Sequence, residues 1–205
     1  MSISHPVDSN VRGPEAPSER RGEIAQAALE LFATKGYRAT TMADIGARLG
    51  IRGPSLYKHI GSKQELLVGI MHASMDRLLD DHRAAVATAA GVEAQLRRAV
   101  EAHVRFHTRH RDEAFVGTRE IDSLDPAERR TIVAKRASYE QAFRTLIETG
   151  CAEGRFQVAS SRLASYAILD MGMGVAVWFR ADGPATADEV AYAHGDYALR
   201  LVGAD

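Results

Sequence analysis

The feature that most constrains this fold is a pair of helix signals, separated by a tight turn, in the first third of the chain. Thr41 with Asp44 three residues later forms a capping box, which predicts a helix that starts directly after Thr41. Gly50 suits the end of this helix, and Pro54 suits the first position of the next one, where an N–H is not needed. Two short helices joined in this way are typical of the helix-turn-helix, whose second helix enters the major groove of DNA.

The second of these helices is expected to use Leu56, Tyr57 and Ile60 as its anchors. Tyr57 has two compatible interpretations, a core residue and a residue whose hydroxyl reaches DNA. Ser62 with Glu65 forms another capping box, so a third helix is predicted to follow at once.

Basic residues are concentrated in this segment, although the whole chain carries a formal net charge of −1. Between Thr34 and Lys63 the one acid is Asp44, and the basic residues are Lys35, Arg38, Arg48, Arg52, Lys58 and Lys63. Such a patch is what neutralisation of DNA phosphates requires. The alternative is a three-helix unit with a solvated basic face, and the coincidence of caps, turn and charge favours DNA binding.

A longer pattern contains these signals. Its segments are Ala27-Ala28-x2-Leu31-Phe32-x3-Gly36-Tyr37, Ala39-Thr40-Thr41-x2-Asp44-Ile45-Gly46, Leu49-Gly50-Ile51, Ser55-Leu56-Tyr57-Lys58-His59-Ile60 and Ser62-Lys63-Gln64-Glu65-Leu66-Leu67. The pattern resembles the TetR family of transcriptional regulators, with Gly46 where that family usually has alanine and Ile60 where it usually has phenylalanine. The resemblance implies an all-α protein, in which an N-terminal helix-turn-helix domain precedes a C-terminal helical domain for ligand binding and dimerisation.

Helical periodicity continues to the end of the chain, and no alternating run predicts a strand. Besides the two short helices, the expected segments are 19–35, 62–89, 92–110, 113–122, 126–151, 160–180 and 186–203, about nine helices in all. Residues 1–18 contain prolines and few apolar residues and are expected to form a disordered tail. We assign 19–65 to the DNA-binding domain and 66–205 to the ligand-binding and dimerisation domain.

The segment 163–179 is very apolar. It is slightly short for a bilayer span and is accompanied by Arg162, Asp170 and Arg180, so a membrane helix is the less favoured interpretation. We expect instead a helix buried by the core and by a second subunit. The resemblance implies that this helix and the last one form a four-helix interface in a homodimer.

Several classes of site find little support in the sequence. The single cysteine, Cys151, cannot form an internal disulfide, and no segment resembles a signal peptide, so we expect a cytoplasmic protein. His103, His107 and His110 share one helix, but neither a cysteine nor an HExxH pattern joins them, and a metal site is disfavoured. No phosphate loop and no G-x-S-x-G motif occurs, so neither enzyme activity nor a cofactor is expected.

The resemblance implies contacts with a double-stranded DNA operator. The candidate residues are Thr41, Arg52, Pro54, Ser55, Tyr57, Lys58, His59 and Lys63. Ser55 and Lys58 suit base edges. Tyr57, His59 and Lys63 suit phosphate oxygens.

The resemblance also implies a small-molecule effector that changes the spacing of the two DNA-binding heads. Candidate ligand-binding residues are Met71, Met75, His103, Phe106, His107, Phe115, Arg119, Tyr139, Phe143, Met171, Val175 and Trp178. Methionine and aromatic residues at helical spacing are usually plain core, and we keep that alternative for about half of them.

A further resemblance concerns the effector class. The stretch 103–107, then Arg119 and Glu120, then the helix with Tyr139 and Phe143, looks like the TetR subgroup that senses acyl-CoA thioesters in steroid and fatty-acid catabolism. An acyl-CoA needs apolar space for its acyl chain and cations for its phosphates. The expected cations are Arg105, Arg109, Arg111 and Arg119.

The preferred interpretation is therefore a homodimeric, ligand-responsive repressor that binds a palindromic operator. Two alternatives stay open at this point. One is a DNA-binding regulator without a small-molecule effector, and the other is a helical ligand-binding module whose helix-turn-helix is vestigial.

Overall fold

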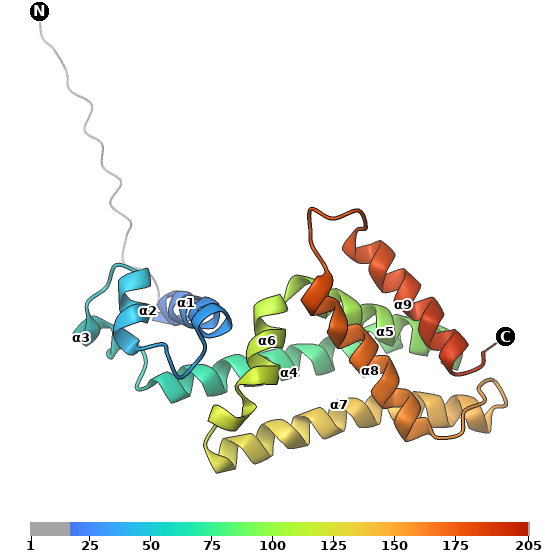
Figure 1. The fold of residues 1–205 in the computed structure, drawn as a ribbon. Coiled ribbons are helices and arrows are strands. Elements are labelled where there is room, and N and C mark those ends of the chain that lie inside the picture. Colours follow the sequence, from blue (N-terminus) through green and yellow to red (C-terminus); the bar gives the residue numbers. More distant parts are fainter. Residues whose placement is uncertain (1–16, 205) are drawn as a thin grey trace, which may run out of the picture.

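The structure, a computed structural model, describes residues 17–204 and is all-α within them, which confirms the predicted fold class (Figure 1). The elements are α1 (Pro17–Lys35), α2 (Met42–Arg48), α3 (Gly53–Leu56), α4 (Lys63–Ala87), α5 (Val92–Arg109), α6 (Arg111–Arg119), the 3-10 helix η1 (Ile121–Ser123), α7 (Pro126–Ala152), α8 (Ser161–Trp178) and α9 (Ala187–Leu201). The predicted tail mostly lies outside the described residues, but its last two positions, Pro17 and Ser18, already belong to α1.

Local signals in the sequence account for several helix ends. The Thr41 hydroxyl accepts the N–H of Asp44 at 3.1 Å while the Asp44 carboxylate accepts the N–H of Thr41 at 2.8 Å, so this capping box is confirmed. The one at Thr186 is confirmed as well. Ser62 caps α4 through its hydroxyl, but the Glu65 carboxylate accepts the N–H of Gly61 rather than that of Ser62.

Helix α4 joins the two parts of the molecule. Figure 1 shows α1 to α3 gathered at one end, with α4 running from them into the body formed by α5 to α9. Within the body, α5 packs against α4, α7, α8 and α9. Its residues Leu96, Ala99, Val100 and Val104 are fully buried, which makes α5 the centre of the core. The proposed domain boundary after residue 65 falls in the first turn of α4.

Polar contacts tie the end formed by α1 to α3, which is the predicted DNA-binding end, to the body. The Glu120 carboxylate, at the end of α6, accepts the backbone N–H of Tyr37 at 3.1 Å and the hydroxyl of Ser123 at 3.0 Å. The Gln64 side-chain amide, in its fully satisfied orientation, donates to the Tyr37 hydroxyl and accepts the N–H of Asp125 at 2.8 Å. The loop after α1, the start of α4 and the α6–α7 connection thus meet in one polar joint.

The segment predicted to be buried by the core and a partner, now α8, lies across the body in Figure 1. It begins with Ser160 as its N-cap and ends before Phe179. None of the helices in residues 17–204 has the length and apolar content that a membrane crossing requires.

Replacing Glu120 by Ala should loosen the polar joint. The Tyr37 N–H would lose its acceptor in a partly buried place, which costs about 1–2 kcal/mol of unfolding free energy. Asp122→Ala is a control, because Asp122 pairs with Arg129 at 2.9 Å on the surface, where a salt bridge contributes little. Denaturant unfolding and amide exchange at Tyr37 measure both effects, and equal losses in the two variants would contradict the assignment.

Candidate DNA-binding surface and ligand cavity

The second helix of the helix-turn-helix is shorter than predicted. Helical geometry is limited to Gly53–Leu56, and the chain turns through Tyr57 to His59. The Leu56 carbonyl accepts the N–H groups of both His59 and Ile60, at 3.0 and 3.1 Å, so the end of the helix is tightened rather than extended. Leu56 and Ile60 are buried anchors, but Tyr57 is 56% exposed, and its prediction as an anchor was wrong.

This exposed stretch carries most of the predicted DNA contacts. The side chains that face solvent are those of Thr41, Arg52, Pro54, Ser55, Tyr57 and Lys58, and His59 is half-buried. The structure therefore leaves these groups accessible to a nucleic acid, while their contacts with DNA stay a prediction.

The basic patch is smaller than a count of cations indicates. Lys35 pairs with Asp44 at 2.9 Å, and Arg48 pairs with Glu30 at 2.6 Å. The exposed cations of the patch without a carboxylate partner among the described residues are Arg38, Arg52 and Lys58. Arg38 was not among the predicted contact residues, although it belongs to the same basic run in the sequence.

Lys63 has an internal role. Its ammonium donates to the carbonyl oxygens of Tyr37 and Thr40, both at 2.7 Å, and lies 4.2 Å from the centre of the Tyr37 ring. These contacts hold the loop between α1 and α2 on the first turn of α4. Its predicted contact with phosphate is untested, and the ammonium has at most one proton left for it.

The turn after α2 explains why position 46 carries glycine, where the family usually has alanine. The Gly46 carbonyl accepts the N–H of Ile51 at 2.9 Å, and a Cβ at this position would meet the Ile51 carbonyl oxygen at 2.9 Å. That distance is shorter than real Cβ contacts allow. Glycine therefore lets the turn after α2 fold back closely on the helix.

A cavity of about 660 Å³ lies in the body between α4, α5, α6, α7 and α8. Its size falls in the range of small-molecule sites. Five of the predicted ligand-binding residues line it, namely Met75, His103, Phe106, His107 and Tyr139. All five side chains are buried, and we call them the buried wall.

His103 is held in one orientation within this wall. Its Nε2 lies 3.1 Å from the Leu169 carbonyl, which only accepts, so Nε2 carries the proton. Burial lowers the pKa of His103 to about 4, so the ring is neutral, and its Nδ1 accepts the hydroxyl of Tyr139 at 3.0 Å. Gly172 makes this possible, since a Cβ there would lie 2.3 Å from the imidazole.

Three arginines of the cavity lining are less buried than this wall, and we call them the arginine rim: Arg136, Arg144 and Arg162. Arg136 donates to the Gly117 carbonyl at 2.6 Å, and burial lowers the pKa of its guanidinium. Arg144 lies 3.7 Å from Glu140, yet its buried Nε has no hydrogen-bond partner among the described residues. The lining therefore holds three arginines against two carboxylates, Glu140 and Asp170.

The arginines expected at the phosphates are elsewhere. Arg105 pairs with Asp188 at 2.7 Å, and Arg111 donates to the Ala176 carbonyl at 2.9 Å. Arg119 is exposed and lies 4.8 Å from the centre of the Phe115 ring. Neither they nor Arg109 belongs to the cavity lining. The arginine rim was missed, since none of its three members was considered as a ligand contact.

The other predicted ligand-binding residues also lie outside the lining. Met71, Phe143 and Val175 are buried core residues, and Phe143 supports the rings of His103 and Tyr139. Phe115 and Met171 are partly exposed. Trp178 is 55% exposed, because α8 ends there and the next residue, Phe179, takes the buried position, so its placement on an inward face was wrong.

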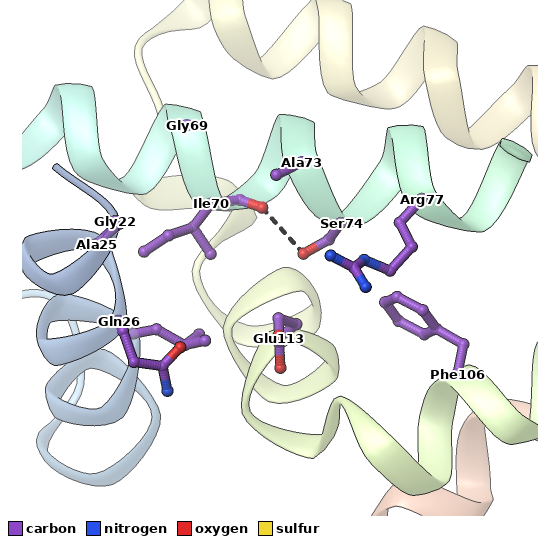
Figure 2. Close-up of a pocket in the computed structure, with 11 residues that line it drawn as sticks. Gly22, Ala25, Gln26, Gly69, Ile70, Ala73, Ser74, Arg77, Phe106 and Glu113 are labelled. Atoms are coloured by element: carbon purple, nitrogen blue, oxygen red, sulfur yellow. Dashed lines mark hydrogen bonds between the residues drawn. The ribbon is translucent and has the colours of Figure 1, made fainter. Parts of the chain in front are cut away.

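A second, smaller cleft of about 180 Å³ lies between α1, α4 and α6, where the DNA-binding end meets the body. Figure 2 shows Gln26 of α1 and Glu113 of α6 across from Ile70 and Arg77 of α4. The ring of Phe106 reaches this cleft from α5 and also lines the larger cavity. One side chain thus borders both the larger cavity and the junction between the two parts of the molecule.

An apolar face is exposed on the last two helices. Among the described residues, its large hydrophobic side chains are Leu163, Tyr166, Met173, Val177, Trp178, Tyr192, Tyr197 and Leu201. Of these, Tyr166 and Met173 also belong to the cavity lining. Large hydrophobic side chains exposed in this number on two helices are typical of an interaction surface.

The histidines of α5 do not converge on a metal. Both ring nitrogens of His103 have the hydrogen-bond partners given above, and Nδ1 of His110 lies 3.1 Å from the Glu113 carboxylate. Between residues 17 and 204 no group of three or more His, Cys, Asp or Glu side chains is placed to hold a metal ion.

Replacing Lys63 by Met should lower stability, because the Tyr37 and Thr40 carbonyls lose a charged donor. We expect a loss of about 1–3 kcal/mol in denaturant unfolding. Lys58→Met is the matched control: exposed and unpaired, it should leave stability within about 0.5 kcal/mol. Lys58→Met should instead weaken binding to all DNA sequences and reduce the salt slope by about one. A stable Lys63→Met variant with only a reduced salt slope would return Lys63 to phosphate binding alone.

Two family models match the chain. Residues 24–70 match "Bacterial regulatory proteins, tetR family", and residues 89–202 match "Tetracyclin repressor-like, C-terminal domain". The first match ends within α4, and the second begins just after α4.

Individual proteins agree with these matches. The transcriptional repressor KstR2 of Rhodococcus jostii is 30% identical over 85% of this chain and 86% of its own length. The transcriptional activator FasR of Mycolicibacterium smegmatis is 39% identical over 49% of this chain, a match that spans 47% of FasR. The structure of AibR in complex with isovaleryl coenzyme A and operator DNA has a TM-score of 0.79 at 24% identity, covering 91% of this chain and all of that one, which shows a shared fold. The chain therefore belongs to the TetR family of bacterial transcriptional regulators.

Proposed function

We propose that this protein is a homodimeric repressor that releases its operator when an acyl-CoA thioester occupies the 660 Å³ cavity. The observation that carries the proposal is the combination of a buried apolar and aromatic wall with the arginine rim in one cavity. An acyl chain suits the wall, and the anionic CoA part suits the rim.

The arginine rim has unused capacity for an anion. The buried Nε of Arg144 has no hydrogen-bond partner among the described residues and lies 4.0 Å from a carboxylate oxygen of Glu148. Arg162 is exposed, and its Nε donates to the Tyr166 hydroxyl at 3.1 Å, which leaves its other N–H groups for an anion. Arginine presents several donors in a fixed fork, which matches phosphate oxygens. An anion at the rim would therefore gain charge-assisted hydrogen bonds without breaking a buried ion pair.

Dimerisation is supported by the exposed apolar face on α8 and α9. Covering this face with its copy in a second subunit removes it from water and generates two-fold symmetry. A two-fold dimer presents two DNA-binding heads to the two halves of a palindromic site. The heads lie at the other end of the molecule from α9 in Figure 1, so the dimer contact leaves them free.

The relatives support the direction of regulation. KstR2 is a repressor, and its similarity to this chain extends through the ligand-binding part, whereas the similarity to the activator FasR covers about half of the chain. KstR2 of Mycobacterium tuberculosis is described as a ketosteroid transcriptional regulator. The AibR complex indicates that this fold is able to hold an acyl-CoA and an operator in that protein.

Phe106 offers a route from the ligand to the DNA-binding end. Because its ring lines both the cavity and the junction cleft, a ligand that displaces it changes the packing between α1 and α4. The polar joint at Glu120 transmits movement of α6 to the loop after α1. A ligand that binds one head spacing more tightly then shifts the population toward that spacing.

An acyl-CoA should release DNA in a gel-shift assay with the DNA upstream of the protein's own gene. The matched free acid should be weaker, because it lacks the phosphates that the rim binds. At a concentration a hundred times its Kd, the thioester should raise the free energy of unfolding by about 2.7 kcal/mol. Arg162→Ala should remove the difference between thioester and acid. If thioester and acid release DNA from the unmodified protein equally well, the acyl-CoA assignment fails. If the ligand-free protein does not bind DNA at all, the assignment as a repressor is contradicted.

Val177→Glu should yield monomers with weakened operator binding. The side chain is 69% exposed within the apolar face, and a buried unpaired carboxylate at a dimer contact is costly. Thr131→Glu is the control, since Thr131 is exposed on α7 and belongs neither to that face nor to the cavity lining. Light scattering measures the mass, and a dimer that survives Val177→Glu would place the interface elsewhere.

A further inference from the structure

His107 lies on the buried wall of the cavity with a hydrogen-bonding capacity that its neighbours do not use. Its side chain is 4% exposed, and neither ring nitrogen has a hydrogen-bond partner among the described residues. The rings of His103 and Phe106 pack on it, with centroids 4.5 and 5.3 Å away. A buried polar group without a partner costs free energy, which a bound polar group recovers.

The histidine one turn earlier provides a contrast. Both nitrogens of His103 are used, by Tyr139 and by the Leu169 carbonyl. His82 also has an unpartnered Nε2, but it lies outside the cavity lining and packs on Tyr139 and Phe143. His107 is therefore the histidine of the buried wall whose hydrogen-bonding capacity is unused by the described residues.

The charge of His107 restricts what it binds. Burial lowers the pKa of the imidazole to about 2, so the ring is neutral at pH 7. A neutral imidazole offers one N–H donor and one acceptor nitrogen. It suits an uncharged oxygen and provides no positive charge for a carboxylate or a phosphate.

We propose that His107 forms a polar subsite of the cavity, and that the natural ligand carries a hydroxyl or carbonyl oxygen within its apolar part. A hydroxyl satisfies either nitrogen, and a carbonyl satisfies the N–H. The proposal rests on the proposed function for the role of the cavity as effector site, and it narrows the effector class to oxygenated acyl groups. A site with a buried hydrogen-bonding group discriminates against an analogue that lacks the partner.

Two probes of nearly equal shape test the subsite, 2-naphthol and 2-methylnaphthalene. Their Kd values are measured by NMR titration on the unmodified protein and on His107→Phe. The preference for the hydroxyl probe should be about tenfold greater in the unmodified protein, as one buried hydrogen bond predicts. Comparing the two proteins cancels the different hydration of the probes.

The imidazole ¹⁵N resonances of the unmodified protein give an independent readout. 2-Naphthol should shift a nitrogen of His107, and 2-methylnaphthalene should not. His107→Phe should melt no lower than the unmodified protein, because it removes an unpartnered polar group from a buried place. His110→Phe is the matched control on the same helix end, since His110 lies outside the cavity lining and should keep the preference.

The inference is overturned if the preference is the same with and without His107, if the ¹⁵N resonances do not respond to the hydroxyl, or if neither probe binds. These outcomes are separate from failure of the proposed function, because the probes contain no coenzyme A and the test needs no DNA. A protein that shows the His107 effect but ignores every acyl-CoA would retain the subsite and lose the acyl-CoA assignment.

Discussion

The enclosure of α5 is the constraint on which the rest of the body depends. A helix covered by its neighbours must pair its polar side chains internally, because water is not available to them. Glu101, 2% exposed, does so with Arg98 and Arg105 at 3.0 and 3.3 Å. Thr108 donates to the Arg105 carbonyl at 2.9 Å. Where α5 borders the cavity, this internal pairing is incomplete at His107.

At the DNA-binding end, some basic side chains form contacts within the protein, and others remain exposed for DNA. Half of the basic run is engaged within the protein, by Asp44, Glu30 and the two backbone carbonyls at Lys63. These contacts fix the loop and the first turn of α4, and so they position the exposed cations. The salt dependence of DNA binding reports only the cations that meet phosphate, so it should be weaker than the composition of the segment implies.

The sequence was sufficient for those features that are set locally. Capping boxes, the turn at Gly50 and the apolar stripes predicted the helices and their order, because each signal acts within one or two turns. The length of α3 was overestimated, since the closing contacts on the Leu56 carbonyl depend on how the turn packs. Trp178 was misplaced because a helical period does not show where the helix ends.

The cavity lining depended on tertiary contacts that no local pattern contains. No local pattern distinguishes Arg136 and Arg144 from solvated arginines, and only the packing of α7 against α8, with the contact of Arg136 to the Gly117 carbonyl of α6, places them at the rim. The buried wall was predicted better, with His103, His107 and Tyr139 correctly grouped, because apolar surroundings on both helices indicated an inward face. The sequence could not show which of these histidines lacks hydrogen-bond partners, because that depends on the positions of the Leu169 carbonyl and the Tyr139 hydroxyl.

The absence of a side chain at Gly172 links two positions that are far apart in the chain. The imidazole of His103 occupies the space that a Cβ at 172 would take, and it reaches the Leu169 carbonyl through that space. Relatives that carry a side chain at the position of Gly172 must therefore give up the large ring at the position of His103. These two positions should vary together across the family, and relatives that retain the pair should share a neutral, fixed imidazole in the wall of their cavity.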